Sequence, residues 1–267
     1  CSHECLERHL RTDREQRCEV CETPFEVLYT YQQIDHEGEA HYVCKEACRD
    51  AYFEARRAQE TRMKRIAVLN QKGGTGKTTT SISLAAGLAD LGFKVLLVDL
   101  DSQSNVGVSL GLSARRNISD LLLGEVHAMD CVKRFSDNLD LILSSASLSA
   151  VETELVQVEA ARHEILSERL KPLTRYDFVI LDCSPSLSVL NQNSLTYADH
   201  VLIPVSCDYL SLVGVKNIIR TIKSVNEVLL SPVDILGVVP TFYGLSKQCT
   251  IDTIRSLRGF FKDRVLQ

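Results

Sequence analysis

The sequence predicts an α/β fold, in which a doubly wound, mainly parallel sheet follows a small N-terminal metal-binding module. Two observations support this prediction. From residue 65 onward, short and almost wholly apolar runs alternate with amphipathic stretches, as expected of strands buried on both faces and the helices that cover them. Six of the ten cysteines crowd into the first 48 residues, and clustered cysteines in a reducing compartment more often bind metal than form disulfides.

The composition is that of an ordinary globular protein. The 267 residues are 45% hydrophobic and 24% charged, which suffices for a full-sized core and a small extra module. No stretch approaches the roughly 18 uninterrupted apolar residues of a membrane span, and the N-terminus lacks the apolar centre of a signal peptide. We therefore expect a cytoplasmic location and no transmembrane segment. Because the chain begins at Cys1 rather than methionine, it is expected to be part of a longer protein.

The N-terminal segment holds two closely spaced cysteine pairs. Cys18 and Cys21 have two residues between them, in the pattern C-x2-C, and Cys44 and Cys48 form C-x3-C. Tight turns with these spacings can present four thiolates to one tetrahedral Zn²⁺. A segment with few large aliphatic residues cannot fold well alone, whereas zinc binding supplies on the order of 10 kcal/mol. These four cysteines are the predicted zinc ligands.

The stretch HYVCKEACRDAYFEARR resembles the second half of TRASH/MYM-type treble-clef zinc fingers. Cys1 and Cys5 repeat its spacing, so residues 1–12 are interpreted as the tail of a preceding finger, within a zinc-finger-like module of residues 1–54. The polar, helix-favouring residues 55–62 are interpreted as a helical linker. An alternative pairing remains open: Cys1, Cys5, Cys18 and Cys21 on one metal, with Cys44 and Cys48 using His36 or His41.

The charge of this segment bears on what it binds. Residues 1–62 hold nine Lys/Arg against fourteen Asp/Glu, so the basic surface that binds nucleic-acid phosphates is absent. A protein-binding or purely structural role is favoured instead.

Five apolar runs are the predicted strands of the main domain, residues 63–267. Each run is short and rich in β-branched residues, which suits a parallel sheet with helices on both faces. The runs are IAVLN, KVLLVDLD, DFVILDCSP, HVLIPV and DILGVVPT.

The first run leads directly into a glycine-rich loop. The stretch from Asn70 to Ser81, NQKGGTGKTTTS, continues into an apolar-periodic helix that stops at Gly92. Strand, glycine loop and helix together are the context of a P-loop, in which backbone N–H groups and the helix N-terminus hold phosphate. Lys77 would bridge the β- and γ-phosphates, and the Thr78 hydroxyl would bind Mg²⁺. The loop departs from the usual pattern because Gln71 replaces the first glycine and a second lysine, Lys72, follows it.

Three carboxylates follow predicted strands. Asp182 ends the run YDFVILD, where it can hold Mg²⁺ through water as a Walker B aspartate does. Asp99 and Asp101 are two residues apart, so both lie on one face of a strand end. Metal binding does not require all of these carboxylates. The additional one indicates a role in positioning the attacking water. The alternative is that one of them caps the next element, and Asp99 is the better candidate for that.

The motifs KGGTGKTT, VLLVDLDSQSN, YDFVILDCSPSLS and VLIPVSCDYLSLVGV, in this order, resemble the ParA/Soj family of partition ATPases, within a wider class that includes MinD. The resemblance runs from about Met63 to the end. It implies a P-loop NTPase fold, hydrolysis of ATP and an ATP-dependent homodimer in which Lys72 reaches the partner's nucleotide. It assigns catalysis to Lys72, Lys77 and Asp101, and nucleotide and Mg²⁺ binding to Gly73, Gly74, Thr75, Gly76, Lys77, Thr78, Thr79 and Asp182.

The resemblance also implies non-specific DNA binding by the ATP-bound dimer, location on the nucleoid, and a ParB-like or other adaptor that stimulates hydrolysis. Residues 208–267 carry eight Lys/Arg against five Asp/Glu, although the whole chain has a net charge of −5. A solvated helix face explains any one of these cations equally well. The candidate DNA-binding residues are Lys216, Arg220, Lys223, Lys247, Arg255 and Arg258.

Two departures from the family pattern and three other possible functions complete the predictions. Ser184 stands where the family usually has proline, and the chain stops at KDRVLQ, so the ATPase domain and its adenine pocket are expected to be incomplete at the C-terminus. A membrane-associated positioning ATPase like MinD and an iron–sulfur carrier remain alternatives. The carrier requires cysteines at the dimer axis, whereas Cys183 has the sequence context of a small core residue. A further hypothesis is a zinc-finger adaptor that uses the ATPase core only as a dimerisation switch.

Overall fold

The computed structural model describes residues 15–36, 39–60, 63–157, 163–186, 188–207, 211–227, 232–244 and 248–266. The chain forms two compact units, Cys1–Arg62 and Met63–Gln267. Cys1, Cys5 and Lys247 lie outside the described residues, as do residues 1–12. No helix in the described ranges is long and apolar enough to cross a membrane.

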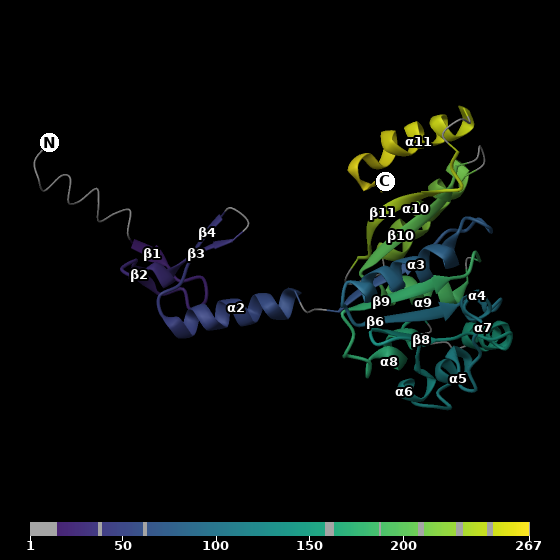
Figure 1. The fold of residues 1–267 in the computed structure, drawn as a ribbon, viewed down its shortest axis with the longest axis horizontal. Coiled ribbons are helices and arrows are strands. Elements are labelled where there is room, and N and C mark those ends of the chain that lie inside the picture. Colours follow the sequence, from purple (N-terminus) through teal and green to yellow (C-terminus); the bar gives the residue numbers. More distant parts are fainter. Residues whose placement is uncertain are drawn as a thin grey trace, which may run out of the picture. The chain divides into compact units, whose positions relative to one another are not determined.

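The N-terminal unit is built from two short antiparallel hairpins and one helix (Figure 1). Its elements are β1 (Glu15–Arg17), β2 (Pro24–Glu26), the 3-10 helix η1 (Thr30–Gln32), β3 (Gln33–His36), β4 (Glu39–Tyr42) and α2 (Glu46–Glu60). Its described core is small and consists of Cys18, Ile34, Val43, Cys48 and Tyr52. Two of these five residues are cysteines, so apolar burial alone gives this unit little stability.

The second unit contains a seven-stranded sheet in the order β11-β10-β5-β9-β6-β8-β7. Every neighbouring pair is parallel except β7 with β8, at one edge. The strands are β5 (Lys64–Val68), β6 (Val95–Leu100), β7 (Lys133–Arg134), β8 (Leu139–Ile142), β9 (Phe178–Cys183), β10 (His200–Ser206) and β11 (Asp234–Thr241). The five predicted strands correspond to β5, β6, β9, β10 and β11, and the predicted fold class is confirmed.

Helices cover this sheet (Figure 1). They are α3 (Lys77–Asp90), α4 (Asn105–Leu110), α5 (Ile118–Leu123), α6 (Ala128–Cys131), α7 (Leu148–Val156), α8 (Ile165–Leu170), α9 (Val189–Tyr197), α10 (Ser211–Asn226) and α11 (Gln248–Phe261), with the 3-10 helix η2 (Lys262–Arg264). Helix α3 ends just before Gly92, whose φ of +92° is a conformation that favours glycine.

The surroundings of the central strand β6 explain why polar and apolar residues do not alternate in its sequence. Leu96 and Val98 belong to the core cluster that α5, α7, α8, α9 and α10 help to form, whereas Val95 and Leu97 belong to the cluster that contains α3 residues. All four side chains have no exposed surface. A strand covered on both faces needs apolar residues at successive positions.

Strand order and register place the functional candidates at one edge of the sheet. In β5 and β9, Val68 pairs with Asp182, and Asp182 pairs in turn with Asp99 of β6. These strands are parallel, so the loop after β5 and the carboxylates of β9 and β6 meet at the same edge.

Candidate nucleotide site and cysteine cluster

The glycine loop between β5 and α3 has a conformation that depends on its glycines. Gly74 and Gly76 have φ values of +68° and +82°, in the left-handed region that side chains with a Cβ adopt rarely. Gly76 is also the N-cap of α3, so the free N–H groups of the first helical turn face the loop. A concave run of backbone donors at a helix N-terminus attracts phosphate groups.

Lys77, the first residue of α3, lies within this loop. Its side chain is 7% exposed, and its Nζ donates to the backbone oxygen of Lys72 at 3.2 Å. Burial lowers the pKa of Lys77, while the nearby Asp182 and Asp101 oppose that effect. The loop therefore holds a cation close to two carboxylates.

A cavity of about 590 Å³ opens beside the loop. It brings together the predicted loop residues from Gly73 to Thr79 with Asp101, although these are far apart in the sequence. It also contains residues that the sequence analysis did not identify, which are Ser102, Gln103, Asn105, Ser184, Pro185, Ser186 and Phe242. Phe242 comes from the end of β11, and the Thr241 hydroxyl beside it donates to the backbone oxygen of Thr75 at 2.8 Å.

Asp182 lies behind the loop and is 1% exposed. Its Oδ1 accepts a hydrogen bond from the Ser81 hydroxyl at 2.8 Å, and the backbone oxygen of Lys77, 3.0 Å from Ser81 Oγ, is the alternative acceptor for the same proton. Its Oδ2 is buried and has no hydrogen-bond partner in the described part of the chain. Burial raises the pKa of Asp182 to about 6. An unpartnered carboxylate oxygen beside the Thr78 hydroxyl suits the hydration shell of Mg²⁺, which binds through few protein ligands and keeps several waters.

Asp99 and Asp101 have different surroundings. Asp99 is fully buried, and its two oxygens accept from the backbone N–H groups of Asp101 at 3.0 Å and Val106 at 3.2 Å. Asp99 thus caps the start of α4, as expected, and burial raises its pKa to about 7. Asp101 lines the cavity and accepts from the Gln103 N–H at 3.0 Å. Asp101 is therefore the carboxylate of this pair that faces the nucleotide cavity.

Residues 70–72, at the start of the glycine loop and here called the loop mouth, form hydrogen bonds with neighbouring elements. The Asn70 side chain donates to the backbone oxygen of Pro204 in β10 and accepts from the N–H of Lys72. Gln71 Nε2 donates to Thr221 Oγ1 of α10 at 3.1 Å. Lys72 is half-buried and is not among the residues that line the nucleotide cavity of its own chain.

Comparisons with known proteins identify this arrangement. A protein family described as an AAA domain matches residues 63–235. The sporulation initiation inhibitor protein Soj of Bacillus subtilis is 38% identical over 75% of this chain and 81% of its own length. The chromosome partitioning protein ParA of Caulobacter vibrioides is 38% identical over 75% of this chain and 77% of its own length. The chain belongs to the ParA family of P-loop ATPases.

Solved structures agree with this membership. A cobyrinic acid a,c-diamide synthase from Mycobacterium smegmatis, with bound ATP analog and magnesium, matches with a TM-score of 0.71 at 34% identity, over 75% of this chain and 83% of that one. This ParA-family chain therefore shares its fold with a protein whose solved structure contains an ATP analog and magnesium.

The candidate DNA-binding residues that the structure describes lie on two helices at one edge of the sheet. Helices α10 and α11 both bury residues in the same core cluster, including Ile218 and Leu257. The exposed residues of the set are Arg220 and Lys223 on α10, with Arg255 and Arg258 on α11. Arg255 is 3.4 Å from the Asp252 carboxylate. Lys216 lies on α10, but its side chain is outside the described atoms.

The four predicted zinc ligands come together in the N-terminal unit. The Sγ atoms of Cys18, Cys21, Cys44 and Cys48 all lie within 4.8 Å of one another. Cys21 is 3.5 Å from Cys44, Cys44 is 3.7 Å from Cys48, and Cys48 is 3.8 Å from Cys21. Zn–S bonds of about 2.3 Å in a tetrahedron give S–S separations of about 3.8 Å, so the cluster has the size of a single tetrahedral site. His41 instead contacts Glu19, at 2.9 Å.

The contact between Ser81 and Asp182 leads to a first prediction. Ser81→Ala removes the donor that orients the buried carboxylate, so the Mg²⁺ concentration that gives half-maximal ATP turnover should rise about 10- to 100-fold. The measurement is ATPase rate against Mg²⁺ concentration. Ser194→Ala is the matched control, because Ser194 is also buried and its hydroxyl also donates to a carbonyl of its own helix. Unchanged Mg²⁺ dependence in Ser81→Ala would show that other contacts orient Asp182.

Proposed function

We propose that this protein is an ATP-dependent, dimerising ATPase of the ParA type that acts in plasmid or chromosome partition or in subcellular positioning, and hydrolyses ATP to ADP and phosphate. The observation that carries the proposal is one cavity lined by the glycine loop, Lys77 and Asp101, with the carboxylate of Asp182 buried behind that loop against Ser81. Their order in the sequence and their positions at one sheet edge both support it.

Each residue has a chemical role in the proposed reaction. The loop N–H groups from Gly73 to Thr79 hold the phosphates, and Lys77 neutralises charge on the β- and γ-phosphates. Thr78 and Asp182 hold Mg²⁺, which when bound supplies positive charge at the phosphate oxygens. Asp101 accepts a hydrogen bond from the attacking water and orients it toward the γ-phosphate.

Lys72 is proposed to act across a dimer. Its backbone is fixed at the loop mouth, yet it does not line the cavity of its own chain. A lysine supplied by the partner neutralises phosphate charge only after the two subunits meet, in the manner of an arginine finger worth roughly 10³- to 10⁵-fold in rate. Hydrolysis is then coupled to formation of the ATP-bound homodimer.

We further propose that the dimer binds DNA non-specifically, that the protein is cytoplasmic and associates with the nucleoid, and that a ParB-like or other adaptor stimulates its hydrolysis. The exposed cations of α10 and α11 would supply the phosphate contacts. Family membership supports this assignment more than the charge of the two helices does, because Arg255 also has an acidic neighbour.

The N-terminal unit is proposed to bind one structural Zn²⁺ through Cys18, Cys21, Cys44 and Cys48. The close thiols and the small apolar core support this, because metal binding can provide the stability that so few buried residues do not. The proposed domains are residues 1–54 for the zinc module, 55–62 for a helical linker, and 63–267 for the ATPase domain. The module's acidic balance favours a protein partner over DNA.

An iron–sulfur carrier has less support. Cys131, Cys183 and Cys207 are all buried, between 1% and 5% exposed. Burial raises the pKa of Cys183 to about 12, which disfavours the thiolate that binds metal. None of these three described cysteines offers a thiolate at an exposed dimer face.

The trans role of Lys72 can be tested with a pair of variants. Lys72→Ala should keep ATP binding by the monomer within about threefold but lose ATP-dependent dimerisation, and turnover should fall at least 100-fold, because the partner's cation is missing. Asp101→Ala should bind ATP and dimerise but hydrolyse it at least 100-fold more slowly. Fluorescent-nucleotide binding, sedimentation velocity and phosphate release measure the three properties. A Lys72→Ala protein that dimerises and turns over normally would contradict the proposal.

DNA binding gives a third prediction. The full chain should co-sediment with DNA of unrelated sequence when ATP is present, less with ADP, and binding should weaken steeply between 50 and 200 mM salt. The variant with Lys223→Ala and Arg258→Ala should bind more weakly, with a shallower salt dependence. Lys94→Ala, a cation elsewhere on the surface, is the control. ATP-dependent binding to anionic lipid vesicles but not to DNA would favour the membrane-associated alternative.

The zinc assignment gives a fourth prediction. The purified full chain should contain about one Zn²⁺ per molecule by elemental analysis. Cys48→Ser should reduce this to well below half, because three remaining thiolates hold zinc weakly. Cys131→Ser, at a buried cysteine of the ATPase unit, should leave the zinc content unchanged. Iron at the same stoichiometry would contradict the assignment.

A further inference from the structure

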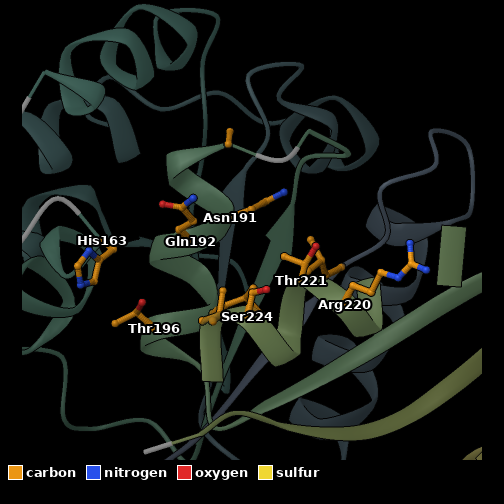
Figure 2. A pocket seen from close by; sticks show the side chains of 11 residues that line it. His163, Asn191, Gln192, Thr196, Arg220, Thr221 and Ser224 are labelled. Atoms are coloured by element: carbon orange, nitrogen blue, oxygen red, sulfur yellow. The ribbon is translucent and has the colours of Figure 1, made fainter. Parts of the chain in front are cut away.

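A second cavity, of about 520 Å³, lies between α9 and α10 and does not share a lining residue with the nucleotide cavity (Figure 2). Leu69, at the end of β5, forms part of its wall together with Leu195 of α9 and Val225 of α10. Figure 2 shows polar side chains around this space, among them Asn191 and Thr196 of α9 and Thr221 and Ser224 of α10. Most of the wall surface is therefore apolar, although eight of the eleven lining residues carry a polar or charged group.

Asn191 is a buried polar residue with one unused hydrogen-bonding atom. Its side chain is 3% exposed. Nδ2 donates to the backbone oxygens of Ser184, at 3.0 Å, and Ser186. These two bonds fix the orientation of the amide, and Oδ1 has no partner in the described part of the chain. Ser188 also lines the cavity, and its hydroxyl likewise has no hydrogen-bond partner among the described residues. A buried acceptor without a donor favours a ligand that brings an N–H or O–H group.

Two basic side chains flank the cavity. Figure 2 shows His163 and Arg220 on opposite sides of it, with the guanidinium of Arg220 extended away from the centre. Arg220 is exposed and forms no ion pair with any described residue, so its long side chain is available to turn toward a ligand. This combination favours an anionic group at the opening.

Hydrogen bonds link this cavity to the nucleotide site at two places. Thr221, in its wall, accepts from Gln71 next to Lys72. Asn191 holds the backbone of Ser184 and Ser186, both of which line the nucleotide cavity. A ligand that engages Asn191 and displaces α10 relative to α9 would therefore act on Gln71, before the glycine loop, and on the Ser184–Ser186 wall of the nucleotide cavity.

We propose that this cavity is a regulatory site for a free small amphipathic anion, with an apolar body of one or two rings, a hydrogen-bond donor for Asn191 and an acidic group for Arg220. Occupation changes the affinity for ATP through Gln71 and through the Ser184–Ser186 loop. The regulatory part rests on the proposed ATPase function, whereas the binding part does not.

The probe is 1-anilinonaphthalene-8-sulfonate, which combines an aromatic body, one N–H group and a sulfonate, and whose fluorescence rises in apolar surroundings. The full chain should bind it at one saturable site. Arg220→Ala should weaken binding about tenfold, and Thr196→Trp, which places an indole in the space, should weaken it at least as much. Arg255→Ala, an exposed arginine on α11, should change it less than twofold. Circular dichroism confirms that each variant is folded.

Several outcomes would overturn the binding part: equal probe binding by wild type, Arg220→Ala and Thr196→Trp; unsaturable binding; or complete, competitive displacement by ADP. Complete loss of the probe when ATP dimerises the Asp101→Ala protein would also overturn it, because a second copy of the chain would then cover the cavity.

The regulatory part is measured separately. Saturating probe should shift the dissociation constant for a fluorescent ATP analogue at least threefold in wild type and leave it unchanged in Thr196→Trp. The shift must be reciprocal, so the nucleotide should change probe affinity by the same factor. Lys77→Ala, which loses nucleotide binding, should still bind the probe. Probe binding without any shift would overturn regulation alone, and a chain that binds the probe but hydrolyses no ATP would count against the proposed function and not against this site.

Discussion

The register of three parallel strands determines where chemistry can occur in this protein. Val68 of β5, Asp182 of β9 and Asp99 of β6 lie side by side across the centre of the sheet. Because side chains alternate between the two faces, a slip of one residue in β9 would turn Asp182 toward the opposite face and remove it from Ser81 and the glycine loop. The apolar residues on both faces of these strands fix this register, so the core specifies the site.

The cost of burying charge explains how the carboxylates are arranged around Lys77. Asp99 and Asp182 are nearly completely buried, and burial raises the pKa of both. Asp99 offsets this cost with two backbone N–H donors and so supports the loop that carries Asp101. Among the described residues, Oδ1 of Asp182 has a donor, Ser81, whereas its Oδ2 has none. A buried carboxylate oxygen without a hydrogen-bond donor favours the binding of a cation at this site.

Local patterns made much of this site predictable. The glycine spacing, the apolar runs and the carboxylates at strand ends are contiguous features, and the fold class and the closeness of Asp101 to the loop followed from them. Phe242 was missed because its position depends on β11 lying beside β10, which no short pattern encodes. Ser81 was missed although a signal existed: it stands one helical turn after Lys77, on the same face of α3. Strands β7 and β8 were not predicted, since two and four residues are too few to show a detectable periodicity.

The contacts of Gln71 explain why this loop has glutamine where a standard P-loop has its first glycine. The glycine pattern alone does not provide that explanation. A glycine at this place would leave the loop mouth without a side chain, whereas Gln71 connects it to Thr221 of α10 at 3.1 Å. Asn70 adds a second connection, to β10. The backbone of Lys72 is thus held between two elements that follow β9 in the chain, and Lys72 in turn accepts the hydrogen bond of Lys77. For the proposed role of Lys72 at a partner's phosphate, this rigid backbone is an advantage, because the geometry of approach is then set before the subunits meet. The same rigidity makes the position of Lys72 sensitive to any displacement of α10, which joins the nucleotide loop to the cavity between α9 and α10.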